Sequence, residues 1–140
     1  MKTKEYLGQY IKAKRYAERC FERMKAIDVN PRSPRIDGMP KATSSGSDLA
    51  DTVARIVEIK KKAETAYQKM LILESEISDV IEAVPDLDEK MLLRLRYIEG
   101  LKWNEVAETM HMSERTVFYL HGDALNSAEL YRKSRHIRDG

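Results

Sequence analysis

Residues 113–122 carry side chains suited to reading the base edges of DNA. If Val117 and Leu120 face inward on one helix, a rotation of about 100° per residue turns Arg115 and Tyr119 outward. Arginine can bind guanine O6 and N7 with two hydrogen bonds, and threonine or phenylalanine can contact a thymine methyl group. Gly122, on the same outward face, would let the backbone approach closely. The candidate base contacts are Glu114, Arg115, Thr116, Phe118 and Tyr119.

The residues before this helix predict a partner helix joined to it by a short turn. Residues 103–110 are expected to be helical, with Val106, Ala107 and Met110 inward, and residues 111–112 form the turn. Ser113 is a suitable N-cap for the next helix. Two short helices joined in this way match the helix-turn-helix pattern, although a helical hairpin without a DNA role stays open. Lys102 and Ser113, at the two helix starts, are also candidate DNA contacts.

Basic residues outside the predicted recognition helix are candidate phosphate contacts, and each could equally be a solvated charge. They are Arg94, Arg96, Arg132, Lys133 and Arg135. The tail at residues 131–140 is expected to be basic, while the net charge of the whole chain is only +2. This distribution permits a nucleic-acid partner without demonstrating one.

No residue pattern predicts enzyme chemistry, a metal site or a cofactor. The three histidines, His111, His121 and His136, lack metal-ligand spacing with one another or with Cys20. The chain has no glycine-rich phosphate loop and no nucleophile motif. A single cysteine fits a reducing compartment, and the apolar runs are too short to span a bilayer. We therefore expect a cytoplasmic protein without a membrane partner.

Two long helices are expected to carry these elements. Residues 1–28 predict the first helix, residues 29–47 a linker rich in proline, glycine and serine, and residues 48–84 the second helix. The second helix has a seven-residue repeat in two interleaved registers: Leu49, Ile56, Ala63, Met70, Ile77 and Val84, with Thr52, Ile59, Ala66, Leu73 and Val80. This repeat is typical of coiled coils. It fits an antiparallel hairpin within the chain or a homodimer or homo-oligomer through residues 49–84, and we favour the dimer.

Residues 86–130 predict the C-terminal domain, which Pro85 separates from the long helix. A first short helix is expected from Asp88 to Glu99, with Gly100 as its C-terminal cap. Its expected inward residues are Met91, Leu92, Leu95 and Ile98. The sequence thus predicts an all-α protein, with a coiled-coil stem followed by a helix-turn-helix domain.

Three segments carry a resemblance to known families: residues 92–97 (LLRLRY), 100–107 (GLKWNEVA) and 110–117 (MHMSERTV). They resemble the sigma-factor domain that binds the −35 promoter element (region four). Nearly the whole chain is similar to small phage and prophage regulators of late transcription of the ArpU and RinA kind. The resemblance implies sequence-specific binding to promoter DNA in a bacterial host, with the same five base contacts, and RNA polymerase as a further candidate partner.

The sequence departs from the sigma pattern at two positions. His111 replaces the usual turn glycine, in a place that favours a left-handed backbone, and Lys102 replaces a capping serine or threonine. Two other functions stay open. One is a small terminase subunit, which also joins a helix-turn-helix to oligomerising helices, and the other is a coiled-coil adaptor that binds no DNA.

Overall fold

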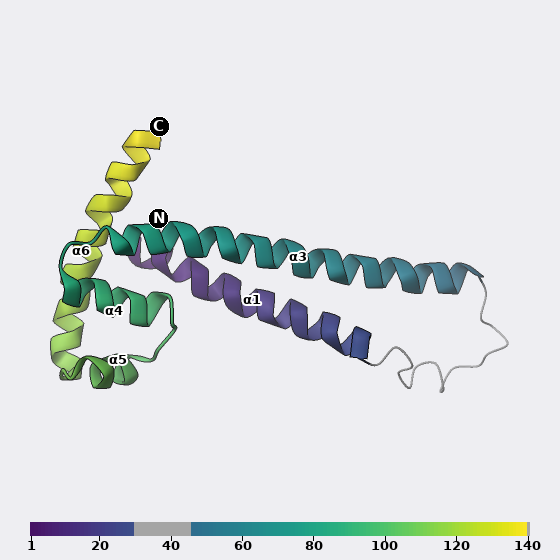
Figure 1. The fold of residues 1–140 in the computed structure, drawn as a ribbon, viewed down its shortest axis with the longest axis horizontal. Helices are drawn as coiled ribbons and strands as arrows, with labels where there is room; N and C mark the ends of the chain where they lie inside the picture. Colours follow the sequence, from purple (N-terminus) through teal and green to yellow (C-terminus); the bar gives the residue numbers. More distant parts are fainter. Residues whose placement is uncertain (30–45, 140) are drawn as a thin grey trace. The chain divides into compact units, whose positions relative to one another are not determined.

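The computed structural model describes residues 1–29 and 46–139. Within them the chain forms helices α1 (Thr3–Val29), α3 (Gly46–Glu82), α4 (Leu87–Tyr97), α5 (Trp103–Met110) and α6 (Glu114–Asp139) and no strand (Figure 1). The all-helical prediction is therefore confirmed. Most of the predicted linker lies outside the described residues. Helix α6 runs through the predicted basic tail, so that tail continues the helix.

The helices form two compact units, one of residues 1–12 with 71–140 and the other of residues 13–70. Both long helices contribute to both units. The sequence assigned residues 1–28 to a separate stem segment, whereas in the structure the first turns of α1 belong with the C-terminal helices. These turns join the C-terminal helices because they carry large buried side chains. Leu7 is completely buried and Tyr10 is 5% exposed.

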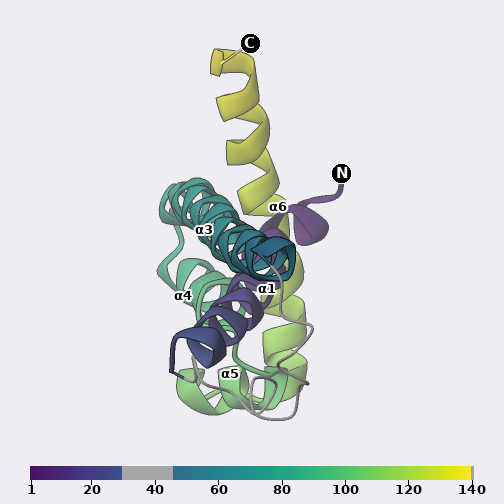
Figure 2. The same cartoon turned by 90° about the vertical axis from the view of Figure 1, so that its right-hand side faces the viewer.

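The core of the first unit lies among helices α4, α5 and α6, which pack on one another (Figures 1 and 2). Leu92 of α4, Val106 of α5 and Ala124 of α6 have no exposed surface. The end of α3 adds Ile77 and Ile81, which lie four residues apart on one helix face and are equally buried. Burying an isoleucine or leucine side chain contributes about 1.5–3 kcal/mol, so this apolar core holds α4, α5 and α6 together.

Helix α4 begins one residue earlier than predicted because Asp86 caps it. The Asp86 carboxylate accepts a hydrogen bond from the Glu89 backbone N–H at 2.9 Å. The Glu89 carboxylate in turn accepts a hydrogen bond from the Ser127 hydroxyl of α6 at 2.5 Å. The start of α4 is thereby tied to the middle of α6.

The buried face of α4 is broader than the predicted stripe. Met91 was expected inward and is 52% exposed, while Leu93 is completely buried. Ile98 is half-buried rather than buried. Both α3 and α6 contact α4 through polar pairs, so α4 is covered on two sides. A single helical stripe could not describe that environment.

The second unit pairs part of α1 with part of α3, which lie side by side (Figures 1 and 2). The rings of Phe21 and Tyr67 pack edge to face, with centroids 5.5 Å apart. Ala63 and Ala66 of the predicted seam are buried, and their small side chains allow close helix packing. Leu49, at the start of the same seam, is 66% exposed. The seam is therefore covered over its later part and exposed at its start.

Candidate nucleic-acid interface

A tight left-handed turn joins α5 to α6. His111 has φ 56° and ψ 43°, the left-handed conformation expected at this position. The Met112 N–H donates to the Ala107 carbonyl at 3.0 Å, and the His111 N–H donates to that of Glu108 at 3.2 Å. These bonds satisfy carbonyls at the end of α5 and reverse the chain within residues 111–113.

Ser113 caps α6 as predicted. Its hydroxyl oxygen accepts a hydrogen bond from the Thr116 backbone N–H at 3.1 Å, and the two side-chain hydroxyls lie 2.9 Å apart. At the start of α5, the Lys102 side chain makes no capping bond. The Glu105 carboxylate accepts from the Lys102 backbone N–H at 2.9 Å instead. Both helices of the turn thus begin with defined polar contacts.

The outward face of α6 carries the predicted base contacts. Phe118 and Tyr119 are 71% and 59% exposed, and Glu114, Arg115 and Thr116 are exposed as well. The Arg115 guanidinium lies 5.9 Å from the centre of the Tyr119 ring. Gly122 is exposed, and a methyl group added to it would meet no atom within 4 Å. The face is open and contains aromatic, hydroxyl and charged groups at one end of α6.

The inward face of α6 holds this end in place. Val117 is 1% exposed, Ala107 of α5 is 5% exposed, and Leu120 is half-buried. The sequence correctly predicted that Val117 and Ala107 are buried. It did not predict the burial of His121, which follows Val117 by four residues and is only 8% exposed.

His121 is the centre of an aromatic cluster that links α4, α5 and α6. Its Nε2 lies 2.7 Å from the Tyr97 hydroxyl of α4, and its ring packs edge to face with Trp103 of α5, with centroids 4.5 Å apart. Burial, together with the positive charges of Lys4 and Arg96, lowers the pKa of His121 to about 4. Burial likewise raises the pKa of Tyr97 to about 12. A neutral imidazole and a protonated phenol therefore share this hydrogen bond.

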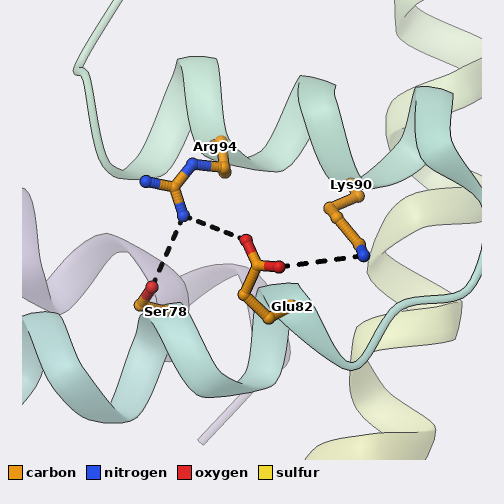
Figure 3. Close-up of polar contacts among 4 residues, drawn as sticks. All are labelled: Ser78, Glu82, Lys90 and Arg94. Carbon is orange, nitrogen blue, oxygen red and sulfur yellow. Dashed lines mark hydrogen bonds and ion pairs between the residues drawn. The ribbon is translucent and has the colours of Figure 1, made fainter.

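The two predicted phosphate contacts on α4 are engaged within the protein. Arg94 Nη1 lies 3.2 Å from the Glu82 carboxylate and 3.4 Å from the Ser78 hydroxyl, and Lys90 binds the same carboxylate at 3.8 Å (Figure 3). Arg96 donates to a backbone carbonyl, that of Leu101, at 2.8 Å, and also lies over the Trp103 ring at 4.5 Å. These arginines join helices or turns, which leaves them less available to a ligand.

The predicted phosphate contacts on α6 differ from one another. Arg132 donates to the Met1 carbonyl at 2.6 Å. Lys133 forms an exposed ion pair with Glu129 at 3.5 Å. The side chain of Arg135 lies outside the described residues.

A cleft of about 250 Å³ adjoins the outward face of α6. Its walls come from α1, α5 and α6, and the lining residues are Lys4, Trp103, Glu114, Val117, Phe118 and His121. Two of these, Glu114 and Phe118, are predicted base contacts. Sequence reasoning missed the contribution of Lys4, because nothing in the local pattern of α1 brings it to the C-terminal helices.

The described residues contain no group of three or more histidine, cysteine, aspartate or glutamate side chains that could hold a metal ion. No helix within them is long and apolar enough to cross a membrane.

Comparison with known proteins identifies the family. The model of the family described as "Protein of unknown function (DUF1492)" matches residues 43–129, which include α3, α4, α5 and most of α6. The chain belongs to this family. No curated protein and no solved structure matches the chain.

Proposed function

We propose that this protein is a sequence-specific DNA-binding regulator of transcription in which α6 is the recognition helix. Helices α5 and α6 would form a helix-turn-helix of the sigma region-four kind, carried on a hairpin stem of α1 and α3. The start of α6 would enter the major groove, and α5 would cross the DNA backbone. The protein would act in the cytoplasm of a bacterial host.

The observation that carries this proposal is the construction of residues 103–119. A left-handed His111 and a capping Ser113 lie in the turn between α5 and α6, and both Ala107 and Val117 are buried. The same arrangement leaves Arg115 and Tyr119 exposed on the opposite side of the helix. A stable helix that presents an arginine and an aromatic ring at its first turns suits readout of base edges.

The resemblance of the chain to late regulators of the ArpU and RinA kind supports a narrower proposal. The targets would be phage or prophage promoters, and RNA polymerase would be a second partner at those promoters. Self-association through α3 would place two recognition helices on one site. A small terminase subunit would use similar elements, so size in solution separates the two functions. A dimer supports a regulator, and a large ring supports a terminase.

The principal test uses Arg115→Ala. A duplex is first selected from a random pool by the wild-type protein, and the variant is then titrated against this duplex and a scrambled one. A bidentate contact with guanine discriminates by about 1–3 kcal/mol, so we expect roughly tenfold weaker binding to the selected duplex and little change on the scrambled one.

Lys133→Ala is the matched control, because Lys133 is an exposed cation on the same helix that pairs with Glu129. It should affect both duplexes equally or not at all. Equal losses on both duplexes for Arg115→Ala would instead make Arg115 a phosphate contact. If the wild-type protein enriches no sequence and binds no duplex, the adaptor function replaces the proposed one.

A further inference from the structure

A DNA interface of this kind needs cations that face the phosphate backbone. The sequence alone does not predict which cations are available to do so. Phosphate contacts supply most of the non-specific affinity of DNA-binding proteins. Arg94, Arg96 and Arg132 make hydrogen bonds within the protein. On the recognition helix itself, Arg115 is adjacent to Glu114, whose negative charge offsets it. Another source of positive charge beside α6 is therefore needed.

The first turns of α1 are anchored beside the recognition helix. Arg132 of α6 donates to the Met1 carbonyl at 2.6 Å, and its guanidinium lies 5.2 Å from the centre of the Tyr6 ring. Thr3 is 7% exposed and Leu7 is completely buried. A methyl group added to Gly100 would lie 3.2 Å from the Ile11 side chain. The position of Lys4 is thus fixed by contacts on both sides of it in the sequence.

Lys4 lies in the same cleft as two predicted base contacts. It lines this cleft with Glu114 and Phe118 of α6 and with Trp103, the first residue of α5. Its side chain is exposed, and it makes no ion pair with any residue that the structure describes. Lys102 immediately precedes Trp103 and is exposed as well. Two lysines from distant parts of the chain therefore lie close to Trp103.

We propose that Lys4 contacts a DNA phosphate beside the recognition helix, so that the start of α1 is part of the DNA interface. In a helix-turn-helix the first helix crosses the backbone, and here α5 begins at the cleft that Lys4 lines. Lys4 would also offset the repulsion between Glu114 and the nearby phosphates. This inference rests on the proposed function and adds a residue outside residues 43–129, which the family model matches.

The test measures affinity and its salt dependence for Lys4→Gln. The probes are the duplex selected by the wild-type protein and its scrambled counterpart, titrated at several potassium chloride concentrations. Loss of one phosphate contact should weaken both duplexes severalfold and alike. It should also lower the slope of log K against log salt by about 0.9. Lys4→Arg, which keeps the charge, should retain the wild-type slope.

Lys12→Gln is the matched control, because Lys12 is exposed on the same helix two turns further on and does not line the cleft. It should leave both affinity and slope unchanged. The inference is overturned if Lys4→Gln keeps the wild-type slope while the wild-type protein binds DNA, whether or not affinity falls. Absence of binding by the wild-type protein would overturn the proposed function itself, so the two failures are distinct.

Discussion

At the scale of single residues, His121 explains how a polar ring can hold a core together. Its imidazole is buried, hydrogen-bonded to Tyr97 and packed against Trp103, so α4, α5 and α6 each contribute one ring. An unpaired buried imidazole would cost stability, whereas this one has a partner. The cluster therefore joins α6 to both α4 and α5.

The titration of His121 leads to a prediction about stability. In the unfolded chain the imidazole has a pKa near 6.5, and in the folded protein its pKa is about 4. Between these values the unfolded state binds a proton that the folded state does not. The free energy of unfolding should therefore fall as the pH is lowered from 6.5 to 4, by up to on the order of 3 kcal/mol. Urea unfolding at a series of pH values measures this dependence.

Two variants isolate the contribution of His121 from that of carboxylates titrating in the same range. His121→Phe keeps a ring of similar size and should remove most of the dependence between pH 6.5 and 4. His111→Asn, at an exposed turn residue that tolerates the left-handed conformation, should keep it. An equal slope in wild-type protein and His121→Phe would contradict the prediction.

At the residue scale, the sequence predicts which side chains are exposed but not which of them form ion pairs. Helical rotation alone correctly predicted that Arg115 and Tyr119 are exposed and that Val117 is buried. It could not tell which cations are available. Arg94 and Lys4 look alike in the sequence, but Arg94 binds Glu82 and Lys4 makes no ion pair in the described part of the chain. That difference depends on contacts between residues far apart in the sequence.

At the scale of elements, capping residues in the sequence predict where helices begin, whereas tertiary contacts determine which helix faces are buried. Ser113 caps α6 as predicted, because capping depends on neighbouring residues. The first short helix was predicted to end at Glu99 with Gly100 as its cap, whereas α4 ends at Tyr97 with Ile98 as its C-cap, and Gly100 is a left-handed residue of the following turn. The heptad repeat likewise identified Ala63 and Met70 as seam residues, and both are buried. It could not decide whether the partner is α1 or a second chain, since either can cover the same stripe.

The two left-handed residues, Gly100 and His111, predict stability changes of opposite sign. Gly100 has φ 75°, and a methyl group there would crowd Ile11 at 3.2 Å, so Gly100→Ala should destabilise by more than about 1 kcal/mol. His111→Gly removes the strain of a side chain at φ 56° and should stabilise by up to about 1 kcal/mol. Thermal unfolding followed by circular dichroism measures both. A lower melting temperature for His111→Gly would show that the imidazole makes a stabilising contact.

At the scale of the whole molecule, α3 contributes residues to both compact units. Its end contributes Ile77 and Ile81 to the unit that holds α4, α5 and α6, while its middle packs in the unit that holds the Phe21–Tyr67 pair. The end of α3 supports the helices that carry the proposed DNA-binding surface, which leaves its start available for self-association. The start of α3 has exposed apolar residues suited to self-association.

The start of α3 predicts self-association through an exposed apolar stripe. Leu49, Val53 and Val57 are 66%, 51% and 53% exposed and lie four residues apart, so they share one side of the helix. Covering them with a second copy would remove apolar surface from water. We expect the wild-type protein to be larger than a monomer in sedimentation or light scattering. Val53→Lys with Val57→Lys should reduce it to a monomer whose thermal unfolding is unchanged, because neither valine is buried within the chain.

Met70→Lys is the comparison that separates assembly from folding. Met70 lies in the same heptad repeat but is only 9% exposed, so a lysine there would place a charge among buried side chains. It should lower the melting temperature strongly, whereas the double valine variant should not. If the double variant keeps the wild-type mass, the stripe is not the site of association. If the wild-type protein is already monomeric, the later part of the seam is covered by α1 of the same chain and the predicted dimer does not form.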